Sequence, residues 1–185
     1  MGFMTAVLAV LVVAALIVVS LYNRLVRLRA TSESAWSDID VQLKKRYDLV
    51  PNLVETVKGY AAHEQRLFIK VTEARSLAMS ASGPAETAKA ETMLRESLKS
   101  LFAVAEAYPD LKANQNFIQL QGHLMEIEDA VEAARRYYNA VVRDLNTVIE
   151  QFPSNLVATR FKFEKRDFFE LESPAAERRP VRVAF

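Results

Sequence analysis

The pattern of apolar and polar residues divides the chain into one unbroken apolar run and several segments with helical periodicity. Residues 1–23 contain no charged side chain, and between Phe3 and Leu21 only Thr5 and Ser20 interrupt the apolar run. A run of about 20 such residues matches the hydrocarbon core of a bilayer, which is roughly 30 Å thick. The pattern therefore predicts a transmembrane helix over residues 1–23.

The residues that flank this run predict its orientation. No Lys or Arg precedes the run, whereas Arg24, Arg27 and Arg29 follow it directly. Because basic flanks tend to stay on the cytoplasmic side, we expect the amino terminus outside and the remaining chain in the cytoplasm. The alternative is a cleaved signal peptide, which would need a basic segment before the run and a clear cleavage site near Ser20.

Two long segments show apolar residues at spacings of three and four, which is typical of amphipathic helices. In the first segment these residues are Trp36, Ile39, Leu43, Tyr47, Val50, Val54, Val57 and Ala61. In the second they are Phe117, Leu120, Leu124, Ile127, Val131, Ala134, Tyr138, Val141, Leu145, Val148 and Phe152.

Pro51 lies inside the first segment, where it removes a backbone donor and crowds the carbonyl of Tyr47. Since the spacing continues in phase on both sides, we expect one bent helix. No Gly or Pro lies between Phe3 and Val50, so the membrane helix is expected to continue into this segment without a joint.

Two shorter segments of the same periodicity, 67–81 and 90–105, lie between the long ones, and Gly83-Pro84 separates them. Tyr108-Pro109-Asp110 precedes the last long helix. Short connections between amphipathic helices indicate antiparallel neighbours. The sequence thus predicts an all-α fold, in which the transmembrane helix is followed by an antiparallel four-helix bundle over residues 24–152. The two long outer helices would extend beyond the compact part as a coiled coil or bend back onto it. Residues 153–185 are expected to form a partly disordered C-terminal extension.

Composition limits the partners and the chemistry. The 24 Lys and Arg balance 23 Asp and Glu, so no charge excess favours nucleic acid as a partner. The chain has no Cys, which excludes disulfides, thiolate metal sites and a cysteine nucleophile. Basic clusters at Lys44-Lys45-Arg46 and Arg135-Arg136 are predicted to form solvated helix faces beside neighbouring acids.

Candidate catalytic and metal-binding residues are few. Helical bundles often hold metals through Glu-x-x-His pairs, but Tyr60 and Leu120 stand three residues before His63 and His123, the two histidines. His123 and Glu126 have the reversed spacing, and a solvated histidine is the more common situation. The sequence has no Gly-rich phosphate loop and no nucleophile elbow. We therefore predict no catalytic, cofactor or metal site and a protein that is not an enzyme.

Three segments together resemble the LemA family of bacterial membrane proteins. They read DLVPNLVETVKGYAAHE (48–64), YPDLKANQNFIQLQG (108–122) and ARRYYNAVVRDLNTVIEQFPSN (134–155). The resemblance implies a single amino-terminal transmembrane helix in a bacterial inner membrane and a helical-bundle domain, and it supplies no established catalytic site. The positions that match the family pattern are Asp48, Pro51, Asn52, Leu53, Tyr60, His63, Glu64, Tyr108, Pro109, Leu111, Ala113, Asn114, Phe117, Leu120, Arg135, Tyr137, Tyr138, Asn139, Asn146, Phe152 and Pro153. Asn114 or Asn116 suits a helix cap and Pro153 a helix stop, whereas the remaining positions would be available for a partner surface.

These observations predict a non-enzymatic scaffold or adaptor that is anchored in a lipid bilayer and presents an interaction surface to unidentified protein partners. The alternative is a membrane-tethered ligand- or metal-sensing bundle, with a polar pocket around His63, His123 and the asparagines. From Ser173 onward, Pro174, Pro180 and three arginines predict a disordered basic tail.

Overall fold

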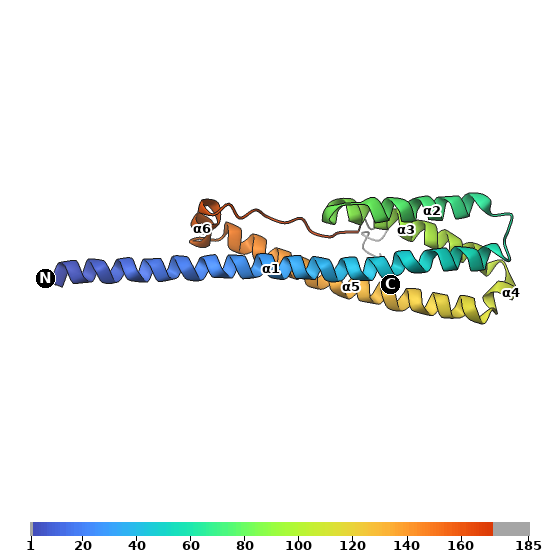
Figure 1. Cartoon of the computed structure of the whole chain (residues 1–185), viewed down its shortest axis with the longest axis horizontal. Helices are drawn as coiled ribbons and strands as arrows, with labels where there is room; N and C mark the ends of the chain where they lie inside the picture. Colours follow the sequence, from blue (N-terminus) through green and yellow to red (C-terminus); the bar gives the residue numbers. More distant parts are fainter. Residues whose placement is uncertain (1, 172–185) are drawn as a thin grey trace, which may run out of the picture. The chain divides into compact units, whose positions relative to one another are not determined.

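The computed structural model describes residues 2–171, and these residues contain helices joined by short connections but no strand. The helices are α1 (Gly2–Lys58), α2 (Gln65–Ser80), α3 (Gly83–Glu106), α4 (Pro109–Lys112), α5 (Gln115–Glu150) and α6 (Ser154–Arg160), drawn in Figure 1. The all-α prediction is confirmed. The basic tail predicted from Ser173 lies outside the described residues.

Helix α1 runs for 57 residues and joins the apolar segment to the first amphipathic segment without a break, as the lack of Gly and Pro predicted. Its amino-terminal part is long and apolar enough to cross a membrane, and the side chains there are exposed. The polar residues that follow do not end the helix. Thr31 and Ser32 donate their hydroxyls back to the carbonyls of Arg27 and Arg29, at 2.9 and 2.7 Å. Hydroxyl bonds to the preceding turn are compatible with a continuous helix, which they often bend slightly.

Pro51 lies inside α1, and the helix continues past it to Lys58. A proline at this position has no N–H to donate to the carbonyl of Tyr47, one turn earlier. In the structure Arg75 of α2 donates its Nε–H to that carbonyl oxygen at 2.7 Å. A side chain of the neighbouring helix thus replaces the backbone hydrogen bond that Pro51 removes.

The chain forms two compact units, and one of them contains Val41–Glu132. This unit holds the carboxy-terminal part of α1, all of α2, α3 and α4, and the beginning of α5. Gly83, at a φ of 78°, forms the reversal between α2 and α3, and Pro84 follows it in the first turn of α3. Apolar side chains from every helix of the unit are buried, among them Leu43, Val50, Leu53, Val57, Val71, Leu94, Leu98, Leu101, Leu111, Phe117 and Leu124.

The other unit combines the chain up to Asp40 with Ala133–Phe168. Leu25, Leu145, Val148, Val157 and Ala158 form its buried cluster, which joins α1, α5 and α6. The seven-residue helix α6 was not predicted, because it is too short to show a helical period.

Residues 161–168 follow α6 as a segment without regular structure, held by side chains of α5. Asn146 donates its amide to the carbonyl of Arg166 and accepts the N–H of the same residue, both at 2.9 Å. The Tyr138 hydroxyl donates to the carbonyl of Asp167 at 2.9 Å, and the Tyr138 ring lies 5.4 Å from that of Trp36. Two residues of the third family-like motif, Tyr138 and Asn146, therefore hold the backbone of Arg166 and Asp167 against α5.

Phe152 lies outside the core, contrary to the prediction. The three-and-four spacing placed it on the buried stripe of the last long helix, but α5 ends at Glu150 and Phe152 is 75% exposed. The spacing continued past the residue at which the helix stops. Pro153 follows directly at the start of α6, in agreement with its predicted role as a helix stop.

Candidate functional site

A groove of about 330 Å³ lies between α3 and α5. Each helix contributes four side chains at the spacing i, i+3, i+4, i+7. Those of α3 are Arg95, Leu98, Lys99 and Phe102, and those of α5 are Gln121, Leu124, Met125 and Glu128. This spacing places each set on one face of its helix, so the groove follows two helical turns on both sides.

The centre of the groove is apolar and its margins are polar. Leu98 and Leu124 are 3% and 5% exposed and form its floor, whereas Met125 is 63% exposed and stands open to solvent. The ring of Phe102 lies 6.1 Å from that of Phe117, which supports it from the core side. A thioether such as that of Met125 adapts to differently shaped apolar surfaces.

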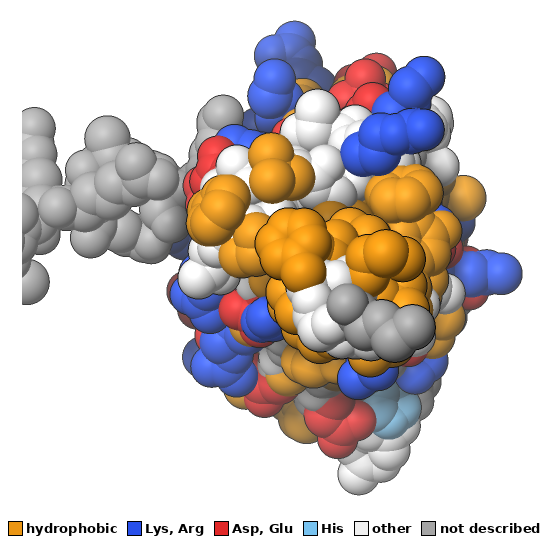
Figure 2. Space-filling view, turned by 90° about the vertical axis from the view of Figure 1, so that its left-hand side faces the viewer, with side chains coloured by type: hydrophobic (Ala, Val, Ile, Leu, Met, Phe, Trp, Pro, Cys, Tyr) orange, Lys and Arg blue, Asp and Glu red, His pale blue; other side chains and the backbone are white. Residues whose placement is uncertain are grey.

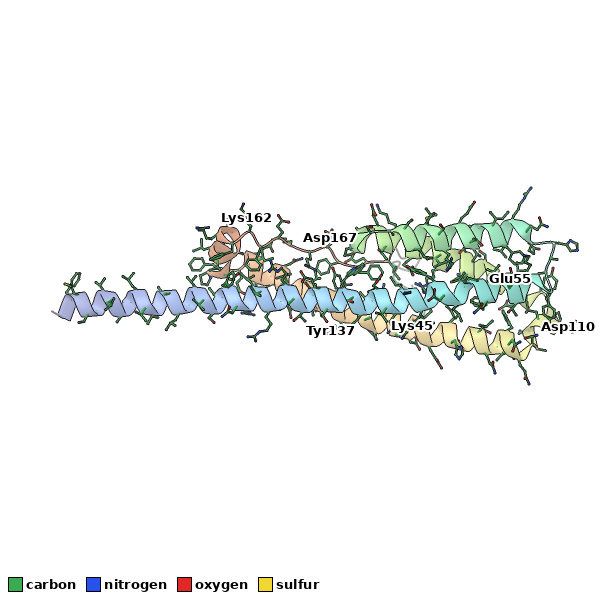
Figure 3. All side chains as sticks on the ribbon, viewed as in Figure 1. Lys45, Glu55, Asp110, Tyr137, Lys162 and Asp167 are labelled. Atoms are coloured by element: carbon green, nitrogen blue, oxygen red, sulfur yellow. The ribbon has the colours of Figure 1, made fainter. Side chains whose placement is uncertain are left out.

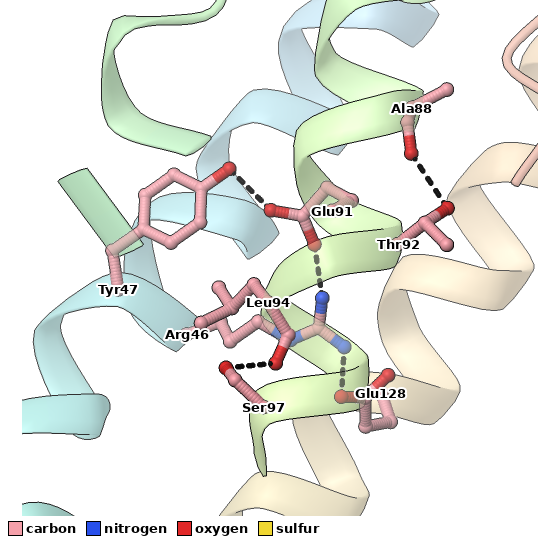
Figure 4. Close-up of polar contacts among 8 residues, drawn as sticks. All are labelled: Arg46, Tyr47, Ala88, Glu91, Thr92, Leu94, Ser97 and Glu128. Carbon is pink, nitrogen blue, oxygen red and sulfur yellow. Dashed lines mark hydrogen bonds and ion pairs between the residues drawn. The ribbon is translucent and has the colours of Figure 1, made fainter. Parts of the chain in front are cut away.

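A buried arginine network reaches the margin of this groove (Figure 4). Arg46 of α1 forms ion pairs with Glu91 of α3 and Glu128 of α5. Tyr47 donates its hydroxyl to the other carboxylate oxygen of Glu91 at 2.6 Å. The side chains of Arg46 and Glu91 are 3% and 1% exposed, but that of Glu128 is 38% exposed. The Glu128 carboxylate at the margin of the groove is therefore held by the buried guanidinium of Arg46.

The position of Arg46 corrects the predicted solvated face at Lys44-Lys45-Arg46. Lys44 and Lys45 are exposed as expected, whereas Arg46 is buried. Arg46 lies three residues after Leu43 and four before Val50, so it occupies the same buried stripe of α1 as these residues.

Burial lowers the pKa of the Arg46 guanidinium, and the charge of the neighbouring Glu91 carboxylate opposes this effect. Removing one member of such a pair leaves an uncompensated buried charge, which typically costs about 3 to 5 kcal/mol. The network therefore makes the joint arrangement of α1, α3 and α5 strongly dependent on these charges.

The two histidines considered in the sequence lie apart from the groove lining and are exposed. His63 is on the turn after α1, and His123 is on α5 with Glu126, which is also exposed. Within residues 2–171 no group of three or more His, Asp or Glu side chains is arranged to hold a metal ion.

The second family-like motif contains a helix cap. Asn114 accepts the N–H of Phe117 through its side-chain oxygen at 3.1 Å and donates its amide to the Tyr60 hydroxyl at 3.0 Å. The predicted cap is thus Asn114, and it also ties the start of α5 to the turn after α1. In the third motif, Tyr137 is labelled in Figure 3 and is 54% exposed, unlike its buried neighbour Tyr138.

The groove was not recognised from the sequence, although its periodicity is present there. Leu124 belongs to the predicted apolar stripe of the last long segment, and Met125 stands beside it without belonging to that stripe. The signal that could have indicated the groove is the exposed apolar residue adjacent to a core residue. Recognising it requires knowing that α3 and α5 lie side by side, which the sequence alone does not give.

Comparison with known proteins gives one family and several relatives. Residues 35–185 match the model of the LemA family, which confirms the resemblance of the three motifs. Magnetosome protein MamQ 2 of Paramagnetospirillum magneticum is 26% identical over 199 residues, covering 92% of this chain and 73% of that protein. Protein LemA of Metamycoplasma hominis is 28% identical over 142 residues, covering 75% of this chain and 64% of that protein.

Proposed function

The chain belongs to the LemA family, and we propose that it is a membrane-anchored scaffold or adaptor that binds an amphipathic helix of a partner protein in the groove between α3 and α5. It acts by presenting this surface at a membrane, without catalysis. The observation that carries the proposal is an apolar strip, two helical turns long, with charged and polar residues on both margins.

The geometry of the groove suits a helix. Helix-in-groove recognition uses apolar anchors at i, i+3, i+4 and i+7 of the ligand helix. Each wall of the groove runs from position i to position i+7, and these seven steps correspond to about 10 Å of helix. Arg95 and Lys99 lie on the α3 side and Glu128 on the α5 side. We therefore expect a partner helix with an apolar face that carries acidic residues toward α3 and a basic residue toward α5.

The apolar amino-terminal part of α1 would anchor the protein in the membrane. Arg24, Arg27 and Arg29 are exposed directly after the apolar run. By the positive-inside tendency these residues support an orientation with the amino terminus outside and the groove in the cytoplasm of a bacterial cell, anchored in the inner membrane. Protease added to intact spheroplasts would then spare the groove-bearing unit, and its digestion from outside would contradict the orientation.

The experiment that tests the groove compares two methionines of similar exposure. Met125 lies in the groove and is 63% exposed, whereas Met93 is on α3 outside the groove lining and is 51% exposed. Full-length protein and its Met125→Glu and Met93→Glu variants are captured from their own membranes after mild solubilisation. We expect Met125→Glu to lose copurifying proteins that wild type and Met93→Glu retain. Equal sets of copurifying proteins in all three samples would contradict the proposal.

A ligand sensor is the second candidate function, and the volume of the groove is what favours it. A volume of about 330 Å³ falls at the lower end of the range for small-molecule pockets. Native mass spectrometry of the full-length protein distinguishes the two functions. A small molecule that stays bound to wild type and is lost from Met125→Glu would support the sensor.

A further inference from the structure

Large apolar side chains remain exposed where α5 ends and α6 turns back along the chain. Phe152, Leu156 and Phe161 are 75, 62 and 50% exposed. Figure 2 looks along the molecule from its amino-terminal end, where the exposed hydrophobic side chains of the apolar run of α1 lie toward the viewer. Groups of exposed apolar side chains mark sites that contact another protein or a membrane.

The level of this surface along α1 is fixed by contacts within one unit. Phe161 lies 4.8 Å from the ring of Tyr22, measured between ring centroids. Leu25 of α1 shares a buried cluster with Val157 and Ala158 of α6. The apolar run of α1 ends at Leu21, so α6 lies beside the first turn or two after the predicted span. In a bilayer this is the depth of the headgroups and the outer ends of the acyl chains.

Basic side chains accompany the exposed aromatic rings. Arg160 lies with its guanidinium carbon 5.9 Å from the centre of the Phe161 ring. Lys162 lies two residues after the end of α6 and is exposed (Figure 3), and Arg24 is exposed on α1. Aromatic rings with neighbouring Lys and Arg are characteristic of protein segments that lie in the membrane interface.

We propose that Phe152, Leu156 and Phe161, together with Arg160 and Lys162, form a second membrane contact, called here the α6 surface. Its occupant is the lipid interface of the leaflet in which the span ends. The inference rests on the membrane anchoring in the proposed function and does not depend on the groove. Lipid is favoured over a partner protein because the α6 surface is continuous with the span and level with its end. The α6 surface therefore restricts how α1 tilts and rotates about the point at which it leaves the bilayer.

Depth-dependent quenching by brominated lipids tests this proposal on the full-length chain in lipid vesicles. The chain has one tryptophan, Trp36, which is replaced by Phe to give a silent background. Tryptophan is then introduced singly as Phe152→Trp or Phe161→Trp. We expect a blue-shifted emission at both positions, with strong quenching by bromine near the ester end of the acyl chain and weak quenching by bromine near the terminal methyl.

Two further variants in the same background serve as references. Val12→Trp lies in the predicted span and should be quenched most by the deepest bromine. Phe168→Trp should not be quenched, because its segment is tied to α1 through the ion pair of Arg166 with Glu33, at 2.6 Å. Glu33 lies about 18 Å farther along α1 than Leu21.

The pattern of quenching separates the possible failures. Quenching of Val12→Trp without quenching at 152 and 161 would overturn the α6 surface while leaving the anchor intact. A blue shift at 152 and 161 that no bromine quenches would mean a protein contact, and it would equally overturn the proposal. Loss of quenching at Val12→Trp as well would overturn the membrane anchoring itself. Circular dichroism confirms that each variant is folded, and Phe152→Trp is the safer variant because its site is the more exposed.

Discussion

Replacing Arg75 with methionine should destabilise the unit that contains Val41–Glu132. Pro51 cannot donate to the Tyr47 carbonyl, so without Arg75 this carbonyl has no hydrogen-bond donor from either source. The Arg75 Nε–H donates to that oxygen at 2.7 Å, and the bond is partly buried. A hydrogen bond with a charged partner contributes about 1.5 to 3 kcal/mol. Since Arg75 is only partly buried, we expect a loss near the lower end, about 1.5 kcal/mol.

The double variant separates the hydrogen bond of Arg75 from its other contacts. In Pro51→Ala the new backbone N–H at position 51 can donate to the Tyr47 carbonyl, as in an ordinary helix. Arg75→Met should then cost less in the Pro51→Ala background, with a coupling free energy of about 1 kcal/mol. Pro51→Ala alone should lower the midpoint of unfolding if packing requires the bend that the sequence predicts at Pro51, since each large side chain withdrawn from the core forfeits about 1.5 to 3 kcal/mol.

The assay is denaturant unfolding of the full-length protein in detergent, followed by circular dichroism for the wild type, the two single variants and the double variant. Arg66→Met serves as the control, because Arg66 is an exposed arginine of the same helix. It should change the free energy of unfolding by less than about 0.5 kcal/mol. Equal costs of Arg75→Met in the two backgrounds would refute the compensation between Arg75 and Pro51.

Three other outcomes follow from the buried side chains. Arg46→Met should lower the free energy of unfolding by about 3 to 5 kcal/mol, because the carboxylate of Glu91 is left buried without its partner; restored stability in Arg46→Met with Glu91→Met would identify the charge as the cause. Leu124→Ala should cost about 2 to 5 kcal/mol in the same assay, whereas Phe152→Ala, at a residue 75% exposed, should change it little. Burial raises the pKa of Tyr138 above its ordinary value of 10. The folded state thus favours the neutral Tyr138 hydroxyl more than the unfolded chain does. The stability that results is present below pH 10 and is lost as the pH rises through the folded-state pKa, so Tyr138→Phe should lessen the alkaline loss of stability.

The helices could be predicted because their periodicity is local. Spacings of three and four located α2 and α5 closely, and the lack of Gly and Pro predicted that α1 would be continuous. The predicted segment 90–105 matched the end of α3 but missed its first turns, because Gly83-Pro84 begins that helix instead of preceding it. Pro51 was correctly placed inside a helix rather than between two. The spacing could not identify the compensating group, since Arg75 lies 28 residues from Tyr47 in the sequence.

The buried charges show the same limit. Arg46 stands next to two exposed lysines, and the three residues together look like a solvated cluster. Its acidic partners Glu91 and Glu128 are 45 and 82 residues away. Only the phase of Arg46 with Leu43 signalled burial, and a charge on an apolar stripe is usually assigned to the surface until its partners are known.

The asparagines of the family-like motifs could be recognised from the sequence but not given a role. Asn146 holds the backbone of Arg166, 20 residues later, and Asn114 caps α5 while it binds Tyr60. These roles depend on segments that return to the helix from elsewhere in the chain. The structure therefore assigns these two asparagines to packing, and the groove, which uses none of them, is left as the candidate partner surface.

Site-specific photocrosslinking in living cells can show whether the groove between α3 and α5 holds a helix of a partner protein. A photoreactive phenylalanine derivative replaces Met125 in the groove or, as the control, Met93 on the other side of α3. We expect a discrete crosslinked product at position 125 and not at 93, with the crosslinked peptide of the partner carrying apolar residues at helical spacing. Equal crosslinking at both positions, or none at 125 in cells that contain the membrane-anchored protein, would contradict it.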